Sequence, residues 1–402
     1  MKELHLLEVD LGWPPEDYLR RKLDGLATAG FRVSVTAERA PRPRRQGNVV
    51  VIRLPSRLEP RAFAAFWLLR DAVVLGVRDP ARLVALARGV RRAHLLRRVL
   101  PIALARPDVV HFEWKRPAIA MLPAFEALGV PVVVSNHAAL TASKVGDPAA
   151  DAYPDLFAAA TAVHCVSEAG RRETERLGLA PGKARVVRNA VDTSLFTPAP
   201  RPRDATLRVI GVGGVDWKKG YGYALGAIAR LRAAGIAVSF EILGGDPAPA
   251  SGRPGDRQRV LYLIHDLGLD DAVTLRGQVS QQEVLERLRA SDVLLQASIS
   301  EGLPNAVLEA MACGLPVVVT DAGGVPEAVT DGVEGFVCPR YSADALADAL
   351  ARIASDPVLA RRMGEAGRKR VCAEFALERQ VEAFAGLYRG LVTARDGRSP
   401  SA

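Results

Sequence analysis

The first half of the chain alternates short apolar runs with longer amphipathic segments. Apolar runs of four to six residues predict strands, and apolar positions that recur every three or four residues predict helices. One such helix is predicted over Glu16–Ala29, closed by Gly30. The predicted strands are His5–Val9, Arg32–Thr36, Val49–Leu54, Val109–Phe112, Val130–Ser135 and Ala162–Val166.

The second half repeats this alternation after a proline-rich segment, Thr197–Asp204, which we interpret as a linker. Its predicted strands are Leu207–Val212, Ser239–Leu243, Val273–Arg276, Val293–Gln296 and Val317–Thr320. Its predicted helices are Tyr221–Ala234, Gln281–Ala290, Asn305–Cys313, Ala343–Ser355, Pro357–Phe375 and Leu377–Thr393.

Strands that alternate with helices indicate parallel sheets, and 402 residues are too many for one core. We therefore predict an α/β architecture of two doubly wound, Rossmann-like domains facing a cleft. The expected domains are residues 1–200 and 201–376, and residues 377–402 form a helix and tail that pack back on the first domain. Ligands should bind beyond the carboxyl ends of the strands.

Composition and charge refine this picture. The hydrophobic fraction of 49% and the charged fraction of 25% exclude a disordered or fibrous chain. The net charge of +9 is uneven, because residues 1–200 hold 30 basic and 20 acidic residues while residues 201–402 hold 24 and 25. The excess therefore predicts an anionic partner for the first domain.

Cysteines and hydropathy indicate the compartment. Four scattered cysteines, Cys165, Cys313, Cys338 and Cys372, form no Cys-x-x-Cys pair and fit buried thiols in a reducing environment. Acids near the N-terminus argue against a signal peptide, and no apolar run approaches the ~20 residues of a membrane span. We expect a cytoplasmic protein that can lie on the inner face of the cell membrane.

The most informative stretch is Ser298–Thr320, where a strand runs through a turn at Gly302–Pro304 into a helix. Unpaired backbone N–H groups at the positive end of that helix suit a phosphate. Glu301 and Glu309 could accept hydrogen bonds from sugar or ribose hydroxyls. The alternative is a structural helix with an acid near its N-terminus and a solvated Glu309.

This stretch resembles the E-x7-E signature of retaining glycosyltransferases of family 4, which have the GT-B fold. The resemblance covers nearly the whole chain, and the combination of motifs is specific although each motif alone is not. The matching segments are Ser167–Glu168, Asn189–Asp192, Phe196–Pro198, Asp216–Gly220, Leu267–Leu269, Gly277, Glu301–Asn305, Glu309–Val318, Gly323–Glu327 and Asp331–Gly335.

The resemblance implies roles for individual residues. Lys219, with Lys218 beside it, would bind the donor diphosphate. Glu301 would hold the sugar hydroxyls, Glu309 the ribose hydroxyls, and His137 would face the transferred sugar, so that His137 and Glu301 are the catalytic candidates. A lone histidine is otherwise more often structural. Backbone contacts to the donor are expected from Gly302, Leu303, Pro304 and Asn305.

The chain departs from the family pattern at two places. Gly214 stands where the family usually has an arginine, which removes one cation from the phosphate site; Lys218 or Arg188 could compensate. The loop from Leu11 to Tyr18 lacks the common glycine pair. We expect the acceptor against this loop, at Gly12 and Glu16, although Glu16 also suits the first turn of a helix.

No metal or cofactor is expected. The sequence contains no Asp-x-Asp and no clustered His/Cys spacing, so no metal-ligand motif is present. The resemblance implies a nucleotide diphosphate sugar, UDP- or GDP-linked, as the donor substrate. Retaining members of the family are thought to react through front-face displacement.

The positive charge concentrates in Arg78–Arg106, with eight arginines and one acid. Leu83, Leu86, Val90, Ala93, Leu96 and Leu100 recur at helical spacing, and Arg88, Arg91, Arg92 and Arg98 project to the other side. A basic amphipathic helix beside Phe63, Phe66 and Trp67 suits an anionic membrane surface. An ordinary surface helix is the alternative, and nucleic acid is not expected because no recognition fold is present.

The function expected from these features is transfer of a hexose-type sugar, with retention, from a nucleotide diphosphate sugar to a glycan or lipid-linked glycan. Three alternatives stay open: a nucleotide-sugar epimerase of the same fold, a phosphorylase that would need a pyridoxal cofactor, and a non-catalytic homologue that binds sugar nucleotides.

Overall fold

The computed structural model describes residues 3–9, 14–38, 45–46, 48–54, 61–90, 93–137, 150–200, 205–246 and 256–397. The chain divides into two compact units. Unit 1 comprises Met1–Val166, Gly170–Val187 and Gln380–Ala402, and unit 2 comprises Ser167–Ala169 and Arg188–Arg379. The backbone therefore changes unit at residues 187–188, before the proline-rich segment at which we expected the boundary, and the last helix returns to unit 1.

Unit 1 is built on a parallel sheet with the strand order β3-β4-β2-β1-β5-β6-β7-β8, in which only the short β3 is antiparallel to its neighbour among the described strands. The inner strands are buried on both faces because helices cover both sides. The strands are β1 (Leu4–Val9), β2 (Phe31–Ala37), β3 (Arg45–Gln46), β4 (Val49–Arg53), β5 (Val109–Phe112), β6 (Val132–Asn136), β7 (Ala162–Cys165) and β8 (Ala184–Val186).

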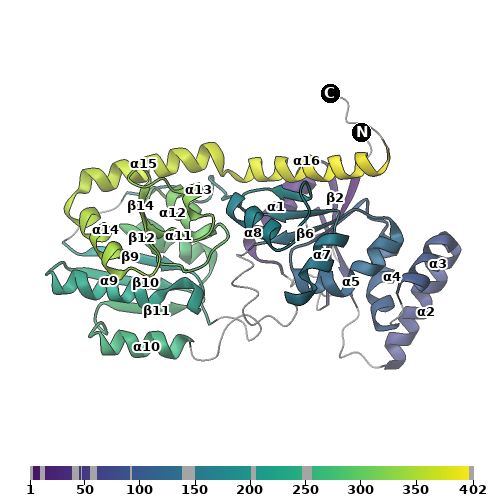
Figure 1. Ribbon diagram of the computed structural model, residues 1–402, viewed down its shortest axis with the longest axis horizontal. Coiled ribbons are helices and arrows are strands. Elements are labelled where there is room, and N and C mark those ends of the chain that lie inside the picture. Colours follow the sequence, from purple (N-terminus) through teal and green to yellow (C-terminus); the bar gives the residue numbers. More distant parts are fainter. Residues whose placement is uncertain are drawn as a thin grey trace. The chain divides into compact units, whose positions relative to one another are not determined.

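The helices of unit 1 include a subgroup, α2, α3 and α4, whose members pack on one another (Figure 1). The helices are α1 (Asp17–Thr28), α2 (Arg61–Arg78), α3 (Pro80–Gly89), α4 (Ala93–Ala105), α5 (Lys115–Leu128), α7 (Tyr153–Ala159), α8 (Glu168–Arg176) and α16 (Leu377–Arg395), with a 3-10 turn at Ala150–Ala152.

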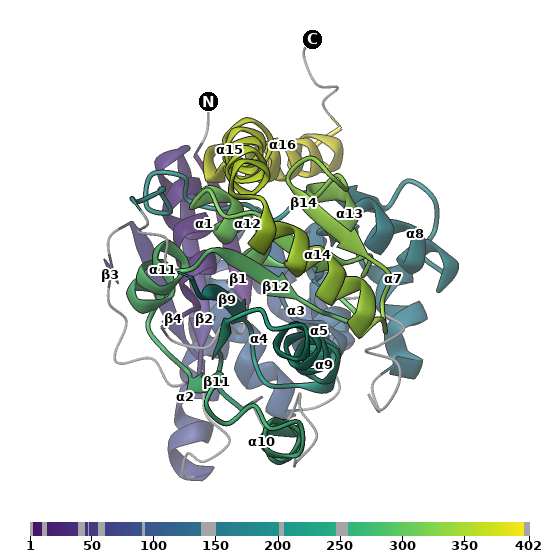
Figure 2. The same ribbon diagram turned by 90° about the vertical axis from the view of Figure 1, so that its left-hand side faces the viewer.

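Unit 2 contains a wholly parallel sheet in the order β11-β10-β9-β12-β13-β14. Its order reverses at β9, and the helices α9 and α14 pack together beside it (Figure 2). The strands are β9 (Leu207–Val212), β10 (Val238–Leu243), β11 (Val273–Gly277), β12 (Val293–Gln296), β13 (Val317–Thr320) and β14 (Gly335–Cys338). The helices are η2 (Trp217–Lys219), α9 (Tyr221–Ala233), α10 (Asp256–Asp266), α11 (Gln281–Ala290), α12 (Asn305–Ala312), α13 (Val325–Ala328), α14 (Ala343–Ser355) and α15 (Pro357–Glu374).

The last helix, α16, supplies part of the core of unit 1, as predicted. Phe384 and Tyr388 are buried, and Tyr388 lies edge-on to Phe31 of β2. On the neighbouring helix α1, a methyl group at Gly25 would lie 2.6 Å from Val381, so glycine permits the close approach of the two helices. The hydrophobic effect of these buried rings therefore holds the end of the chain on the first domain.

The basic stretch Arg78–Arg106 is not one helix. It spans the end of α2, then α3 and α4, because Pro80 starts a new helix behind its N-cap Asp79, whose side chain accepts from Arg82 N. The predicted apolar face is buried at Leu86 and Leu100. Arg98 forms an ion pair with Glu38 and so does not belong to an open basic face, while Arg91 and Arg92 lie outside the described residues.

The exposed apolar side chains of this region lie instead on α2. Phe66, Leu69, Val73 and Val77 are 56–81% exposed, and the spacing i, i+3, i+7 and i+11 places them on one face of the helix. Among the described residues, no helix combines the length and the hydropathy that crossing a bilayer would require.

Candidate functional site

The candidate residues of unit 2 meet at the carboxyl ends of β9 and β12, the two strands beside the point where the sheet order reverses. Lys219 ends the short 3-10 turn that follows β9, and Glu301 lies in the turn that follows β12. Lys219 Nζ donates a hydrogen bond of 2.7 Å to Glu301 Oε1. The structure therefore brings together two residues that the sequence predicted to share a site.

Glu301 is oriented by two further donors that the sequence interpretation missed. Gln296 Nε2 and Ser298 Oγ lie 3.1 and 2.8 Å from the same oxygen, Oε1, and they bond to each other at 2.9 Å. No hydrogen bond to Oε2 is found within the part of the chain that the structure describes. One oxygen of Glu301 is thus saturated by the protein, and the other retains its capacity to accept from a hydroxyl.

Glycines allow the backbone to come close around this pair. Gly323 has φ +56°, and a Cβ there would lie 1.8 Å from the carbonyl oxygen of Glu301. Gly324 N donates to the carbonyl of Gly302 at 2.8 Å, so the loop after β13 is fastened to the turn that carries Glu301. Only glycine fits the first of these positions, which explains the glycine pair that follows the strand.

The helix α12 begins next to this turn without a side-chain cap, because its N-cap residue is Pro304. In unit 2, α11, α14 and α15 are each capped by a serine or aspartate side chain. Leu303 is buried and its carbonyl accepts from Asn189 Nδ2 at 2.7 Å, while Asn305 Oδ1 is buried without a partner among the described residues. The first backbone N–H groups of α12 therefore keep their capacity to bind an acceptor.

The other donor-side candidates are placed less directly. Lys218 forms a 3.8 Å ion pair with Asp216, and its carbonyl accepts from Ile299 N, which ties the lysine turn to the Glu301 turn. Glu309 lies half-buried on α12. Arg188 pairs with Glu327 at 3.2 Å, and that carboxylate also accepts from the N–H groups of Glu168 and Ala169.

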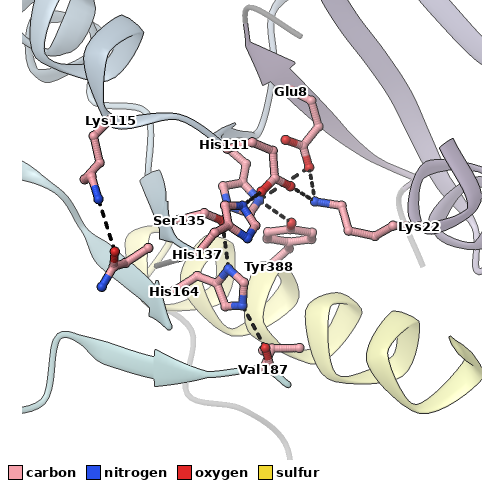
Figure 3. A network of polar contacts seen from close by, with 11 residues as sticks. Glu8, Lys22, His111, Lys115, Ser135, His137, His164, Val187 and Tyr388 are labelled. Atoms are coloured by element: carbon pink, nitrogen blue, oxygen red, sulfur yellow. Dashed lines mark hydrogen bonds and ion pairs between the residues drawn. The ribbon is translucent and has the colours of Figure 1, made fainter. Parts of the chain in front are cut away.

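In unit 1, His137 follows β6 directly and stands in a buried polar network (Figure 3). Its Nε2 lies 2.6 Å from Glu113 Oε2. Glu113 follows β5 and is 1% exposed, and its other oxygen accepts from the ammonium of Lys22 on α1. Lys22 also donates to Glu8 Oε1 of β1 at 2.8 Å.

A second branch of this network crosses the sheet to α16. His164 Nε2 donates to the carbonyl of Val187 at 2.8 Å, so the Nδ1 of the neutral ring accepts from Ser135 Oγ. Ser135 Oγ then accepts from His111 Nε2, and Tyr388 bonds to His111 Nδ1 at 2.7 Å. Burial, together with the neighbouring histidines, lowers the pKa of His164 to about 3, and burial raises the pKa of Tyr388 well above its usual value.

Glu8, His111 and Glu113 are spaced as metal ligands could be, and all three are buried. The ammonium of Lys22 nevertheless bonds to both carboxylates. Lys22 therefore supplies the positive charge that a cation would bring, and the donor set does not fit a resident metal.

The acceptor-side candidates are only partly described. Glu16 is the exposed N-cap residue of α1, and its side chain accepts no hydrogen bond from the helix backbone. Gly12 lies outside the described residues.

Comparison with known proteins identifies the family. The sequence profile described as Glycosyltransferase Family 4 matches residues 16–195, and the profile described as Glycosyl transferases group 1 matches residues 198–370. The D-inositol 3-phosphate glycosyltransferase of Kribbella flavida is 31% identical over 71% of this chain and 71% of that protein. The chain belongs to the family 4 glycosyltransferases.

A further relative and a solved structure complete the comparison. WcaL of Escherichia coli, which carries the name of a colanic acid biosynthesis glycosyltransferase, is 34% identical over 206 residues; the chain spans about half of that relative, 49% of its length. HepE of Anabaena, solved in complex with UDP-glucose, superposes with a TM-score of 0.74 at 16% identity, covering 96% of this chain and 100% of HepE. This likeness shows the two-domain GT-B fold.

Proposed function

We propose that this family 4 glycosyltransferase transfers a sugar from a nucleotide diphosphate sugar to a glycan or lipid-linked glycan, with retention of configuration. The observation that carries the proposal is the group of Lys219, Glu301 and the uncapped start of α12. A cation and free backbone N–H groups suit a diphosphate, and a carboxylate with one unsaturated oxygen suits a sugar hydroxyl.

The donor is proposed to be a UDP- or GDP-sugar, with Glu309 as the acceptor for ribose hydroxyls. HepE binds UDP-glucose, which supports UDP-glucose as the first donor to test. A thermal-shift panel of UDP-, GDP- and ADP-sugars should show a concentration-dependent rise in Tm for one nucleotide. A panel in which no nucleotide raises Tm contradicts the proposed donor class.

Turnover separates the transferase from a sugar-nucleotide-binding homologue without activity, the alternative that Gly214 favours. Wild-type protein should release UDP from UDP-glucose slowly in water, and Glu301→Ala should abolish this release. Glu365→Ala, which removes an exposed acid on α15, is the matched control and should leave the rate unchanged. Donor binding without UDP release would favour the non-catalytic alternative, and a free epimeric UDP-sugar would favour an epimerase.

We also propose that unit 1 lies against an anionic lipid surface through α2, which suits a lipid-linked acceptor. The exposed stripe Phe66, Leu69, Val73 and Val77 offers apolar side chains to the headgroup region, and the exposed Arg78 on the same helix offers charge. This assignment replaces the single basic helix expected over Arg78–Arg106.

Sedimentation with vesicles of phosphatidylserine and phosphatidylcholine tests the lipid surface. The double variant Phe66→Ser, Val77→Ser should reduce the bound fraction several-fold. Val358→Ser, at a valine of unit 2 that is 72% exposed, should not. Equal sedimentation of wild type and double variant would return α2 to a purely structural role.

A further inference from the structure

Glu113 is the only residue of the described network that touches both the buried lysine and His137. Its Oε1 accepts from Lys22 and its Oε2 lies 2.6 Å from His137 Nε2. Glu113 is 1% exposed, whereas the side chain of His137 retains 19% exposure. The carboxylate therefore lies behind the histidine, on its protein side.

Lys22 keeps this carboxylate ionised and in place. Burial alone would raise the pKa of Glu113, but the Lys22 ammonium and the nearby His111 and His137 outweigh it and hold the pKa well below its usual value. Burial alone would likewise lower the pKa of Lys22, but Glu113 and Glu8 outweigh it and raise the pKa. The charged and titratable groups around Glu113 are thus Lys22 from α1, Glu8 from β1 and the histidines of β5 and the end of β6.

An ionised carboxylate can only accept hydrogen bonds. The 2.6 Å contact therefore requires a proton on His137 Nε2, and in the neutral ring this leaves the lone pair on Nδ1. Within the described part of the chain, no hydrogen bond to Nδ1 is found. The partly exposed ring consequently has one nitrogen that the protein uses and one that keeps its capacity to accept from a hydroxyl.

We propose that Glu113, anchored by Lys22, is a positioning residue that fixes the Nε2–H tautomer of His137 and so makes Nδ1 a hydrogen-bond acceptor for a substrate hydroxyl. The proposal rests on the proposed function for the identity of the hydroxyl, a sugar hydroxyl. Its test requires no turnover, because the tautomer of His137 can be observed in the protein without substrate.

The substitution Glu113→Gln should reverse the tautomer of His137. The ammonium of Lys22 has only donors, so the single oxygen of the glutamine amide must face Lys22. The amide NH2 then faces His137 and donates to Nε2. The ring must move its proton to Nδ1, and the outward nitrogen changes from an acceptor to a donor.

The test is NMR of protein labelled with ¹⁵N in the histidine rings at about pH 8. The chain has six histidines, and the His137 signals are assigned from their loss in His137→Gln. We expect the long-range ¹H–¹⁵N pattern of an Nε2–H ring in the wild type and of an Nδ1–H ring in Glu113→Gln. A wild-type ring that carries its proton on Nδ1, or on both nitrogens, overturns the proposal without any variant.

Glu8→Gln is the matched control, because Glu8 bonds to the same lysine but not to His137. It removes the same charge and should leave the His137 pattern unchanged. A changed pattern in Glu8→Gln, or an unchanged one in Glu113→Gln, contradicts the positioning role. If UDP and UDP-glucose fail to bind while the tautomer reverses as expected, the donor proposal fails and the role of Glu113 stands.

Discussion

The ammonium of Lys219 lies 2.7 Å from Glu301 Oε1, although the two residues are 82 positions apart in the sequence. The contact joins the turn after β9 to the turn after β12. The inferred phosphate-binding cation and the inferred sugar-binding carboxylate thus lie within one hydrogen bond of each other, so a substitution at either residue should alter the donor site directly.

Removing the lysine should weaken the binding of a diphosphate more than that of a nucleoside. Lys219→Ala removes a charge-assisted hydrogen bond of about 1.5–3 kcal/mol, so UDP affinity should fall by about one to two orders of magnitude while uridine affinity changes little. Calorimetry measures both. Lys369→Ala, an exposed lysine on α15, is the control, and equal losses for UDP and uridine would refute the phosphate role.

Restoring the family's arginine should strengthen the same site. A Cβ at Gly214 would lie 3.5 Å from the carbonyl oxygen of Gly245, an ordinary contact, so the position accepts a side chain. Gly214→Arg should tighten UDP binding about ten-fold or more, the gain of one cation on a phosphate. Gly214→Gln tests whether the gain is due to charge, and a tighter UDP complex in the glutamine variant would show that it is not.

Gly220 should tolerate no side chain. It has φ +63°, and a Cβ would lie 2.0 Å from the carbonyl oxygen of Ala297. Gly235 has a similar φ of +77° but nothing within 4 Å. Gly235→Ala should therefore lower the free energy of unfolding by about 1–2 kcal/mol, because only the left-handed backbone conformation is unfavourable there. Gly220→Ala should lower it by more than about 4 kcal/mol, and urea unfolding measures both losses. Similar losses for the two variants would show that the close approach at Gly220 relaxes freely.

The buried His164 should make unit 1 less stable in acid. Its pKa is about 3 in the folded protein and has an ordinary value of 6.5, so the unfolded chain binds a proton at a pH where the folded chain does not. Stability should fall from pH 6.5 towards pH 3, by up to about 1.4 kcal/mol per pH unit. In His164→Gln, the slope of the unfolding free energy against pH, measured by urea unfolding, should be smaller by that amount.

The control for this prediction is His265→Gln, because the His265 side chain is 83% exposed. It should leave the slope as in the wild type. A slope that survives in His164→Gln would assign the acid sensitivity to other groups.

The strands were predictable where burial on both faces leaves an unbroken apolar run, as in β5, β12 and β13. The sequence interpretation missed the two-residue β3 and also the longer β8 and β14. Ala184–Val186 has an exposed arginine at its centre, and Gly335–Cys338 begins with a glycine, so strand pairing rather than local propensity forms both. The basic stretch was misjudged because the apolar spacing continues from Leu83 to Leu100, although α3 ends at Gly89 and α4 begins only at Ala93.

The site was predictable in part. The resemblance made Lys219, Glu301 and His137 candidates, and the structure adds the groups that orient these side chains. Lys22 shares the buried stripe of Leu19, Leu23 and Leu26 on α1, so its burial could have been inferred from spacing. Its partner Glu113 is 91 residues away, and no periodicity in one sequence reveals such a pair.

Because α16 belongs to unit 1, the first domain is discontinuous in the sequence. The ribosome must therefore synthesise all of unit 2 before the last helix of unit 1 is available. Until Phe384 and Tyr388 leave the ribosome, Phe31 lacks the edge-on ring of Tyr388, and His111 lacks the Tyr388 hydroxyl. Nascent unit 1 therefore cannot complete its core until all of unit 2 has been synthesised, so the domain that is begun first is the one that is completed last.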